Sequence, residues 1–495
     1  MEHLDVVVIG AGLSGIGAAH YLSTQCPWAE FAVFEARDNL GGTWDLFRYP
    51  GIRSDSDMFT LGYSFRPWDQ PISIADGASI LRYIHDTAVE DGTDSKIRYH
   101  HRVVSAKWST PDARWTITAL RTDTNEEVVL SASYLFSCTG YYRYDRGYLP
   151  EFEGLDSFGG TVIHPQFWPE DFDYTGKRVV VIGSGATAIT LIPAMATSAG
   201  HVTMLQRSPT YVVSLPNHNP ATKVLRKVLP QRFEGSALRW FNALSTQTSY
   251  YLSRRRPALV RKVLMGGVAK QLPEGYDVDT HFSPRYNPWD QRLCVVPDGD
   301  LFAAIRAGNA SVVTDQIVRI TPTGLELASG DTLPADVIVT ATGLDLLFLG
   351  GIELSVDGVD VDVSKRLTYK GMALEGVPNL GLAIGYANAS WTLKAELTFE
   401  YVCRLLNHMR TSATPICTPI CDDADATDDG ALFGLSSGYV VRAVDRMPKQ
   451  GSKFPWRVSQ SYVRDFRALK RSDVVDDSMR FTRPDSHELV SSASK

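Results

Sequence analysis

Two glycine-rich turns are the parts of this sequence best suited to hold a nucleotide. Gly10, Gly12 and Gly15 follow a short apolar run in the pattern G-x-G-x-x-G, and a second turn at 183–188 reads G-x-G-x-x-A. Glycine lets the chain turn sharply and lets a pyrophosphate approach the backbone, while the helix that begins there offers free N–H groups and partial positive charge. One such motif is weak evidence, but two in the same context predict two dinucleotide sites.

The residues that end the second strand of each unit indicate which nucleotide binds. After the first turn, the apolar run 31–34 ends at Glu35, and a carboxylate there accepts hydrogen bonds from ribose hydroxyls and repels a 2′-phosphate. After the second turn, the run 202–206 ends without an acid and is followed by Arg207 and Ser208, which suit a 2′-phosphate. We therefore expect FAD at the first site and NADPH at the second.

Flavin combined with NADPH fits two main chemistries, disulfide reduction and oxygen activation. A disulfide reductase needs a closely spaced cysteine pair beside the flavin. The one close pair, Cys417 and Cys421, lies late in a stretch rich in Thr, Pro and Asp, and we interpret it as structural. Without a redox-active cysteine pair beside the flavin, we predict that the protein activates oxygen.

One segment supports oxygen activation specifically. Residues 158–169 contain the pattern F-x-G-x-x-x-H-x-x-x-W-P, formed by Phe158, Gly160, His164, Trp168 and Pro169. This pattern resembles the fingerprint of the Baeyer–Villiger flavin monooxygenase family at every fixed position. Segments 48–57, 286–292 and 388–394 are similar to the ethionamide-activating branch of that family, and the resemblance extends over nearly the whole chain.

The resemblance implies a reaction and two catalytic residues. In that family NADPH reduces FAD, and the reduced flavin adds oxygen to give a C4a-peroxyflavin that converts ketones to esters or lactones. The same intermediate can oxygenate sulfur, as in sulfides or thioamides. Arg292 matches the active-site arginine, whose fixed charge stabilises the oxygen species, and Asp55 matches the acid that orients it. The fingerprint, His164 included, is interpreted as a hinge.

The resemblance also implies the residues that contact each cofactor. Those expected at FAD are Gly10, Gly12, Ser14, Gly15, Glu35, Thr43, Trp44, Asp55 and Val103. Those expected at NADPH are Arg53, Ser54, Gly183, Ser184, Gly185, Ala186, Thr187, Ala188, Ile189, Arg207 and Ser208. Gln291 departs from the family pattern, because several members carry there a lysine that grips the 2′-phosphate. Trp391 and Met58 fit a substrate tunnel and a hydrophobic core equally well.

These residues must be positioned by an α/β fold with two dinucleotide-binding, Rossmann-like domains. The runs 134–140 and 336–343 both read as strands that end in a Thr-Gly turn, which predicts crossings between the domains near 140 and 344. The expected division is an FAD domain from 1–140 and 345–495, an NADPH domain from 141–213 and 286–344, and a helical insertion from 214–285 in the second domain.

The insertion has an unusual charge. Between Lys223 and Lys270 the sequence contains eleven Lys or Arg residues against one acid, although the net charge of the whole chain is −7. Basic and aromatic residues lie side by side at 239–241 and 250–256, a mixture that suits the surface of an anionic bilayer. The favoured alternative is that these arginines pair with acids elsewhere and the aromatic side chains pack internally.

Composition excludes several other classes of protein. The 495 residues contain 44% hydrophobic and 21% charged residues, as in ordinary globular domains. The acidic balance argues against nucleic acid as a partner, no metal-ligand spacing is present, and no apolar stretch is long enough to cross a membrane. We expect a cytoplasmic enzyme whose partners are a ketone or sulfide substrate and molecular oxygen, with weak peripheral membrane contact left open.

Two other functions remain open at this point. One is an N- or S-oxygenating flavin monooxygenase with little ketone activity. The other is a flavoprotein without catalysis that acts as a redox-sensing binding module, a reading that Arg292, Asp55 and the fingerprint disfavour. The sequence does not indicate the native substrate or the oligomeric state.

Overall fold

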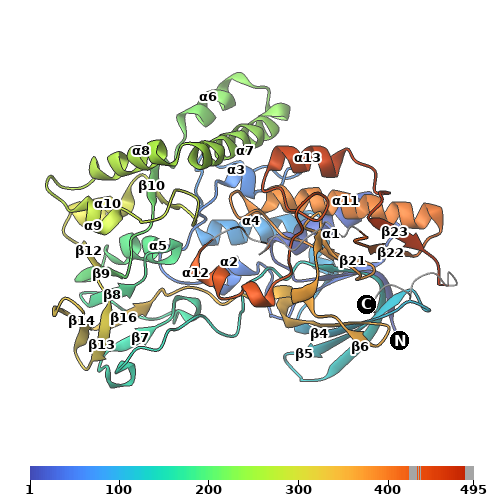
Figure 1. Ribbon diagram of the computed structural model, residues 1–495, viewed down its shortest axis with the longest axis horizontal. Coiled ribbons are helices and arrows are strands. Elements are labelled where there is room, and N and C mark those ends of the chain that lie inside the picture. The colour runs from blue at the N-terminus through green and yellow to red at the C-terminus, as the bar shows by residue number, and fades with distance from the viewer. Residues whose placement is uncertain (423–431, 433, 435, 485–495) are drawn as a thin grey trace.

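The computed structural model describes residues 1–422, 432, 434 and 436–484. Figure 1 shows two bodies side by side, each built on a sheet, with a group of helices along the top. The predicted α/β class, with parallel strands at the centre of both bodies, is confirmed.

The first sheet receives strands from both ends of the chain. Its order is β18-β17-β4-β5-β6-β1-β2-β3, and β21 also pairs with β6. Strands β1, β2 and β3 run parallel, while β4, β5 and β6 form an antiparallel meander beside them. The strands are β1 (His3–Ile9), β2 (Phe31–Phe34), β3 (Ile97–Arg98), β4 (His101–Ser109), β5 (Arg114–Arg121), β6 (Glu127–Ser137), β17 (Glu353–Val356), β18 (Val359–Asp360) and β21 (Leu380–Leu382).

The second sheet is entirely parallel, with the order β12-β9-β8-β16-β7. Its central strands β8 and β16 read as unbroken apolar runs because helices or strands cover both faces. The strands are β7 (Thr161–Ile163), β8 (Arg178–Ile182), β9 (His201–Gln206), β12 (Ala310–Thr314) and β16 (Val337–Thr340). A small antiparallel sheet lies beside it, formed by β13 (Ile317–Thr321), β14 (Gly324–Leu327) and β15 (Thr332–Pro334).

Each glycine turn leads from a strand into a helix. The first joins β1 to α1 (Leu13–Gln25), and the second joins β8 to α5 (Ala186–Met195). Both predicted strand–turn–helix units are therefore present. Helix α1 packs against α11 (Trp391–Ser412), and α5 packs against α10 (Asp300–Arg306).

Four helices lie between two short strands of the second body. Strands β10 (Val212–Leu215) and β11 (Cys294–Pro297) pair in parallel, and the chain between them forms α6 (Pro220–Val228), α7 (Gln231–Arg255), α8 (Pro257–Ala269) and α9 (Val278–Phe282). Helices α6, α7 and α8 form the upper edge of the molecule in Figure 1. Residues 214–285, predicted as a helical insertion, contain these four helices and the end of β10 at Leu215.

The remaining elements cover or extend the first body. The helices are α2 (Thr43–Leu46), α3 (Met58–Leu61), α4 (Gly77–Glu90), α12 (Gly438–Val441) and α13 (Tyr462–Lys470). The strands are β19 (Thr368–Tyr369), β20 (Ala373–Leu374), β22 (Ile416–Pro419) and β23 (Met479–Thr482).

Two segments connect the bodies, and they pair with each other. The chain after β6 meets the chain after β16: the N–H of Leu347 donates to Tyr141 O at 2.9 Å, and the N–H of Tyr148 donates to Gly343 O at 3.2 Å. We propose that the domains divide near 140 and 344, as predicted from the sequence, because the chain passes between the two sheets there. Among the described residues, no helix is both long and apolar enough to cross a membrane.

Candidate active site

A cavity of about 710 Å³ opens between the first glycine turn and the two crossing segments. It receives residues from β1, α1, the loop before α3, both crossings, the loop before β11 and the start of α11. The predicted flavin contacts on its wall are Gly10, Gly12, Ser14, Glu35, Thr43, Trp44, Asp55 and Val103. Its volume lies in the range of ligand pockets, which run from about 300 to 1,000 Å³.

The glycine turn forms one side of the cavity. Gly10 has φ +99°, and a Cβ there would lie 2.7 Å from Cys138 O, so only glycine fits. A Cβ at Gly15 would lie 1.7 Å from Gly10 O, which places Gly15 behind the turn, where helix and strand touch. Gly12 caps α1 without a side-chain hydrogen bond, so the first-turn N–H groups face the cavity without a capping side chain. This cradle fits a pyrophosphate.

Glu35 lies at the end of the cavity formed by β2 and β4. It is 6% exposed, and its two carboxylate oxygens accept hydrogen bonds from the N–H of Ala11 at 2.8 Å and of Arg37 at 3.0 Å. Burial raises the pKa of Glu35, against the lowering effect of these two N–H donors. Each oxygen keeps a further lone pair for a ribose hydroxyl. Val103 lines the same end, where the register of β4 on β5 shifts between Val103 and Ser105.

Arg292 and Asp55 meet on the cavity wall. Nε of Arg292 lies 2.9 Å from Oδ2 of Asp55, and Nη2 donates to Oδ1 at 3.1 Å, so the contact is bidentate. Both side chains are about 30% exposed, which leaves part of the guanidinium open to the cavity. The charge of Asp55 raises the pKa of Arg292 above its ordinary value, outweighing the opposite effect of burial. Two residues 237 positions apart thus fix a permanent cation in the cavity.

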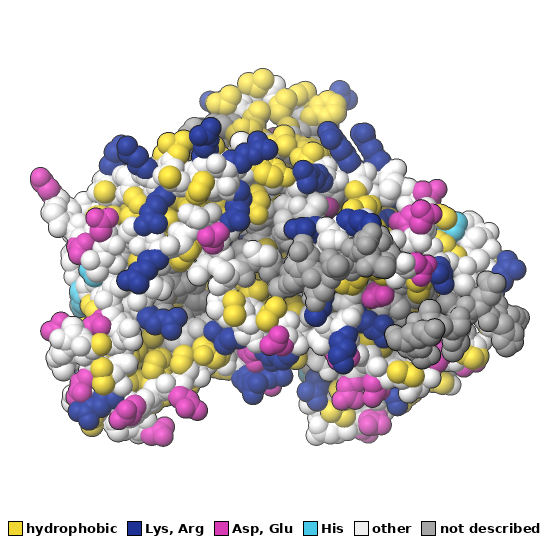
Figure 2. Space-filling view, viewed as in Figure 1, with side chains coloured by type: hydrophobic (Ala, Val, Ile, Leu, Met, Phe, Trp, Pro, Cys, Tyr) yellow, Lys and Arg dark blue, Asp and Glu magenta, His cyan; other side chains and the backbone are white. Residues whose placement is uncertain are grey.

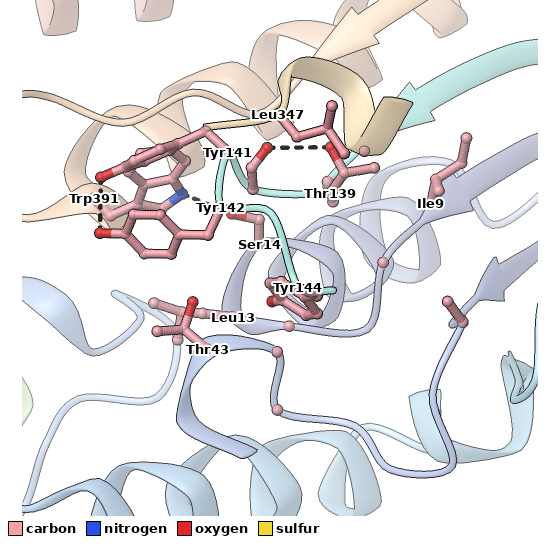
Figure 3. Close-up of a pocket in the computed structure, with 18 of the residues that line it drawn as sticks. Ile9, Leu13, Ser14, Thr43, Thr139, Tyr141, Tyr142, Tyr144, Leu347 and Trp391 are labelled. Atoms are coloured by element: carbon pink, nitrogen blue, oxygen red, sulfur yellow. Dashed lines mark hydrogen bonds between the residues drawn. The ribbon is translucent and has the colours of Figure 1, made fainter. Parts of the chain in front are cut away.

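Aromatic side chains line the wall near the start of α11 (Figure 3). The indole N–H of Trp391 donates to Ser14 Oγ at 2.8 Å, and its ring lies 5.1 Å from that of Tyr141. The hydroxyls of Tyr141 and Tyr142 lie 3.3 Å apart, and burial raises the pKa of both. Trp391 therefore belongs to the cavity. Met58, by contrast, is 1% exposed in the core and does not line it.

The tyrosines are functional candidates that the sequence analysis missed. Tyr141, Tyr142 and Tyr144 all lie within four residues of the Thr-Gly turn that ends β6, and all line the cavity. Three tyrosines directly after a predicted strand were the signal that could have identified them. Leu347 and Leu349 line the opposite crossing and were missed for lack of any polar group.

The second glycine turn is open toward solvent. Gly183 has φ +137°, and a Cβ there would lie 2.3 Å from Ala341 O. A Cβ at Gly185 would meet nothing within 4 Å, and Gly185 caps α5 without a side-chain hydrogen bond. Open space before an uncapped helix start is what a dinucleotide phosphate requires. Ser184 and Ala186 lie at this turn, and Ser184 Oγ donates to Ser208 O at 3.2 Å.

Arg207 follows the end of β9 and is exposed. Within the part of the chain that the structure describes, its guanidinium forms no ion pair or hydrogen bond with another side chain, so it is available to a phosphate. Thr187, at the same turn, lies near the Tyr49 hydroxyl.

Two predicted NADPH contacts, Arg53 and Ile189, have polar groups that bond within the protein. Arg53 forms an ion pair with Asp300 at the start of α10 and does not line the cavity, although its neighbour Ser54 does. Ile189 is 1% exposed in the core, and its N–H donates to Gly185 O within α5. Ala188 is likewise buried. The polar groups of Arg53 and Ile189 thus have protein partners, and their assignment as NADPH contacts stays a prediction.

The fingerprint segment lies behind the crossings and not in the cavity. Its side chains Phe158 and Trp168 pack in hydrophobic clusters, Gly160 lies against Asp336 O, and Pro169 is exposed. The ring of His164 fills the space above Gly147, where a Cβ would lie 2.0 Å from His164 Cε1. Gln166, 3% exposed, donates from Nε2 to Arg143 O at 2.9 Å and Tyr144 O at 3.0 Å. The segment therefore contacts the backbone that carries the cavity tyrosines.

Comparison with known proteins agrees with this geometry. The family model described as flavin-binding monooxygenase-like matches residues 4–349. The chain is 51% identical to the FAD-containing monooxygenase EthA of Mycobacterium tuberculosis, over 97% of this chain and 98% of that protein.

Two solved structures share the fold. An oxidised steroid monooxygenase bound to NADP matches with a TM-score of 0.77 and 22% identity, covering 97% of this chain and 100% of that one. The enzyme OTEMO in complex with FAD and NADP matches with a TM-score of 0.68 and 23% identity, covering 84% of this chain and 86% of that one. The glycine cradle, the cavity and the extent of these matches lead to one conclusion: the chain belongs to the flavin-binding monooxygenase-like family.

Proposed function

We propose that this protein is an FAD-containing, NADPH-dependent monooxygenase of the Baeyer–Villiger type. The overall reaction converts a ketone, O2, NADPH and a proton into an ester or lactone, NADP⁺ and water. The observation that carries the proposal is the bidentate Arg292–Asp55 pair on the wall of the glycine-lined cavity.

The residues present fit both cofactors. The cradle at Gly10–Ser14 with Glu35 would hold FAD, and the turn at 183–187 with Arg207 would hold NADPH. EthA is named an FAD-containing monooxygenase, and OTEMO was solved with FAD and NADP, which supports the same pair here. When bound, reduced FAD supplies the electrons that activate oxygen, and NADPH supplies the hydride.

The chain's own residues then have three tasks. Arg292 keeps its proton at any working pH and stabilises negative charge that develops on oxygen atoms beside it. Asp55 holds the guanidinium in one orientation and acts as a positioning residue. The rings of Trp391, Tyr141 and Tyr142 limit the access of water. The raised pKa values of Tyr141 and Tyr142 keep these two phenols neutral near Arg292.

The same site suits oxygen transfer to sulfur. Sulfides and thioamides carry no net charge, and the aromatic wall offers the hydrocarbon part of such a substrate a matching surface. We therefore include S-oxygenation in the proposal.

The experiment is a panel of ketones and sulfides incubated with the purified protein, NADPH and ¹⁸O2. Mass analysis should find esters or lactones and sulfoxides that contain one ¹⁸O atom, with NADPH consumed in equal amount. Sulfoxides with no ester from any ketone would assign the protein to the N- or S-oxygenating class. NADPH that is not consumed under oxygen with any substrate would remove the catalytic proposal.

A further inference from the structure

The helices at the top of the molecule present an apolar surface to solvent, and we define it as the upper patch. Its exposed apolar side chains lie on α6, α7 and α8: Val224, Val228, Phe233, Phe241, Leu244, Tyr251, Leu252, Leu259 and Val263. Val228 is 73% exposed and Val263 is 66% exposed, values that would be costly for a surface meant to face water alone. Figure 2 shows hydrophobic side chains gathered at this edge with Lys and Arg beside them.

The apolar residues of α7 form one stripe. Phe233 and Tyr251 are five whole helical turns apart, and Leu244 and Phe241 lie about 20° and about 80° around the helix from them, so the four share one side. The buried residues of α7, among them Leu238 and Arg239, lie on the other side, toward α3 and α11. Helix α8 repeats the pattern with Leu259 and Val263 one turn apart. Trp240, at the edge of this stripe, packs on Tyr462 and Phe466 of α13, whereas the exposed side chains of the stripe do not hold the helices on the protein.

Positive charge accompanies the stripe. Three of the eleven basic residues at 223–270 have acidic partners: Arg239 pairs with Glu396, Arg226 with Glu234, and Arg254 with Asp290. Seven exposed ones have no ion pair with any described residue: Lys223, Lys227, Arg232, Arg255, Arg256, Lys262 and Lys270. The expectation that these arginines would pair with acids and the aromatics pack internally is thus correct only for part of the segment. Arg239 and Trp240 are packed inside, against Glu396 and Phe466, and Tyr250 packs on Trp289.

We propose that the upper patch binds the surface of a bilayer that contains anionic lipids. Apolar side chains beside cations match the two layers of such a surface, because the side chains enter the acyl boundary while Lys and Arg contact the headgroups. A second copy of this chain fits less well, since a two-fold contact would set two equally cationic patches against each other. A nucleic acid would leave the apolar stripe uncovered.

The patch is also connected to the active-site loop. Arg254, at the end of α7, contacts Asp290 at 2.5 Å, and Tyr250 packs on Trp289 with ring centroids 5.6 Å apart. Both partners lie within three residues of Arg292. A membrane bound at the patch would therefore lie close to the loop that carries Arg292, where an apolar substrate could leave the bilayer. The binding itself does not depend on the proposed reaction.

The experiment is co-sedimentation of the flavin-loaded protein with vesicles of phosphatidylcholine alone and of phosphatidylcholine with phosphatidylglycerol, at low and at high salt. We expect binding to the anionic vesicles at low salt and little binding in the other three conditions. At low salt, Lys227→Glu/Arg255→Glu should weaken the binding to anionic vesicles by about tenfold or more, and Phe241→Ser/Leu244→Ser should weaken it without any change in charge. The matched control is Lys107→Glu/Arg114→Glu on exposed positions of β4 and β5, which carries the same charge change and should bind like the unmodified protein.

The outcomes separate the possible occupants. Flavin absorbance and thermal midpoint establish that each variant is folded. The proposal is overturned if the unmodified protein does not bind, if high salt leaves its binding intact, or if the control loses as much binding as the upper-patch variant. Sedimentation velocity tests the second-copy alternative: dissociation of a dimer by Phe241→Ser/Leu244→Ser, with vesicle binding unchanged, would assign the patch to self-association instead.

Discussion

At the scale of single residues, the site depends on charges that the fold holds in fixed places. Arg292 has a carboxylate partner and still faces the cavity, whereas Arg207 has no partner among the described residues and faces solvent. The first arrangement suits a charge that must act at one point in a reaction, and the second suits a charge reserved for a ligand. Each leads to a prediction that can be measured without the native substrate.

The Arg292→Ala variant should still bind flavin, and NADPH should still reduce that flavin. Its rate of ester formation should fall by about 10²–10³-fold or more. The physical reason is that hydride transfer needs only the geometry of the two cofactors, whereas oxygen transfer needs the cation. Stopped-flow reduction and product analysis measure the two steps separately. Arg292→Lys is the matched control, because it keeps the charge but loses the bidentate geometry. Its rate of ester formation should lie between that of the unmodified protein and that of Arg292→Ala. Ester formed by Arg292→Ala at the unmodified rate would show that the cation has no such role.

Arg207→Ala should raise the KM for NADPH by roughly 10- to 150-fold, the value of a lost charge-assisted hydrogen bond. The KM for NADH should change little, because NADH has no 2′-phosphate. Steady-state rates with both cofactors give the comparison, and Lys177→Ala, at a partly exposed cation of the same body, is the control. An equal effect of Arg207→Ala on NADPH and NADH would remove Arg207 from the phosphate site.

At the scale of elements, α7 is attached to the first body by a buried ion pair. Arg239 on α7 is 6% exposed, pairs with Glu396 on α11, and donates to Gly62 O at 2.6 Å and Thr60 O at 3.2 Å. Glu396 also accepts from the N–H of Ser64 at 2.9 Å. The pair thus links α7, α11 and the end of α3, so the segment that carries the upper patch has a defined position on the first body.

Arg239→Met should lower the free energy of unfolding by about 3–5 kcal/mol, because it leaves Glu396 charged and buried without its partner. The double variant Arg239→Met/Glu396→Leu should recover part of this loss. Arg232→Met, exposed on the same helix, should change stability by less than about 0.5 kcal/mol. Denaturant titration measures all three. A loss in Arg239→Met no larger than in Arg232→Met would contradict the role given to the pair.

At the scale of the whole molecule, the two bodies meet where the crossings and the fingerprint pack together. His164 fills the space above Gly147, accepts a hydrogen bond from the N–H of Gln166 at Nδ1, and has its pKa lowered chiefly by burial. Gln166 continues the contact to Arg143 and Tyr144 on the cavity side. Protonation of His164 should therefore weaken the contact between the bodies.

The sign of the pH dependence follows from that lowered pKa. An unfolded histidine takes up a proton near pH 6.5, whereas folded His164 resists protonation, so acid favours the unfolded state. The contribution of His164 to stability is complete above about pH 6.5 and is lost as the pH falls toward its folded pKa. The thermal midpoint should thus fall less between pH 7.5 and 5.5 in His164→Gln than in the unmodified protein. His218→Gln, at an exposed position, is the control and should keep the full fall. The same fall in both variants would exclude His164 as the source.

The sequence by itself determined the elements and the residue types at their ends. Apolar runs such as 178–182 and 31–34 end where predicted, because strand patterns and glycine turns are local properties of the chain. For the same reason Glu35 and Arg207, each set by its place after a strand, indicated the two nucleotides. The pairing of Arg292 with Asp55 came from resemblance to a family and not from any local pattern.

Only the tertiary structure decided which side chains meet. The partners of Arg53, Trp391 and Arg239 lie more than 150 positions away in the chain, and no periodicity encodes a contact between elements so far apart. The cavity tyrosines escaped detection because they lie on an irregular crossing, where neither helical nor strand period applies. The composition of the upper patch was visible in the sequence, but only the packing of α7 on α3 and its ion pair with α11 determined which of its aromatic and basic residues face solvent.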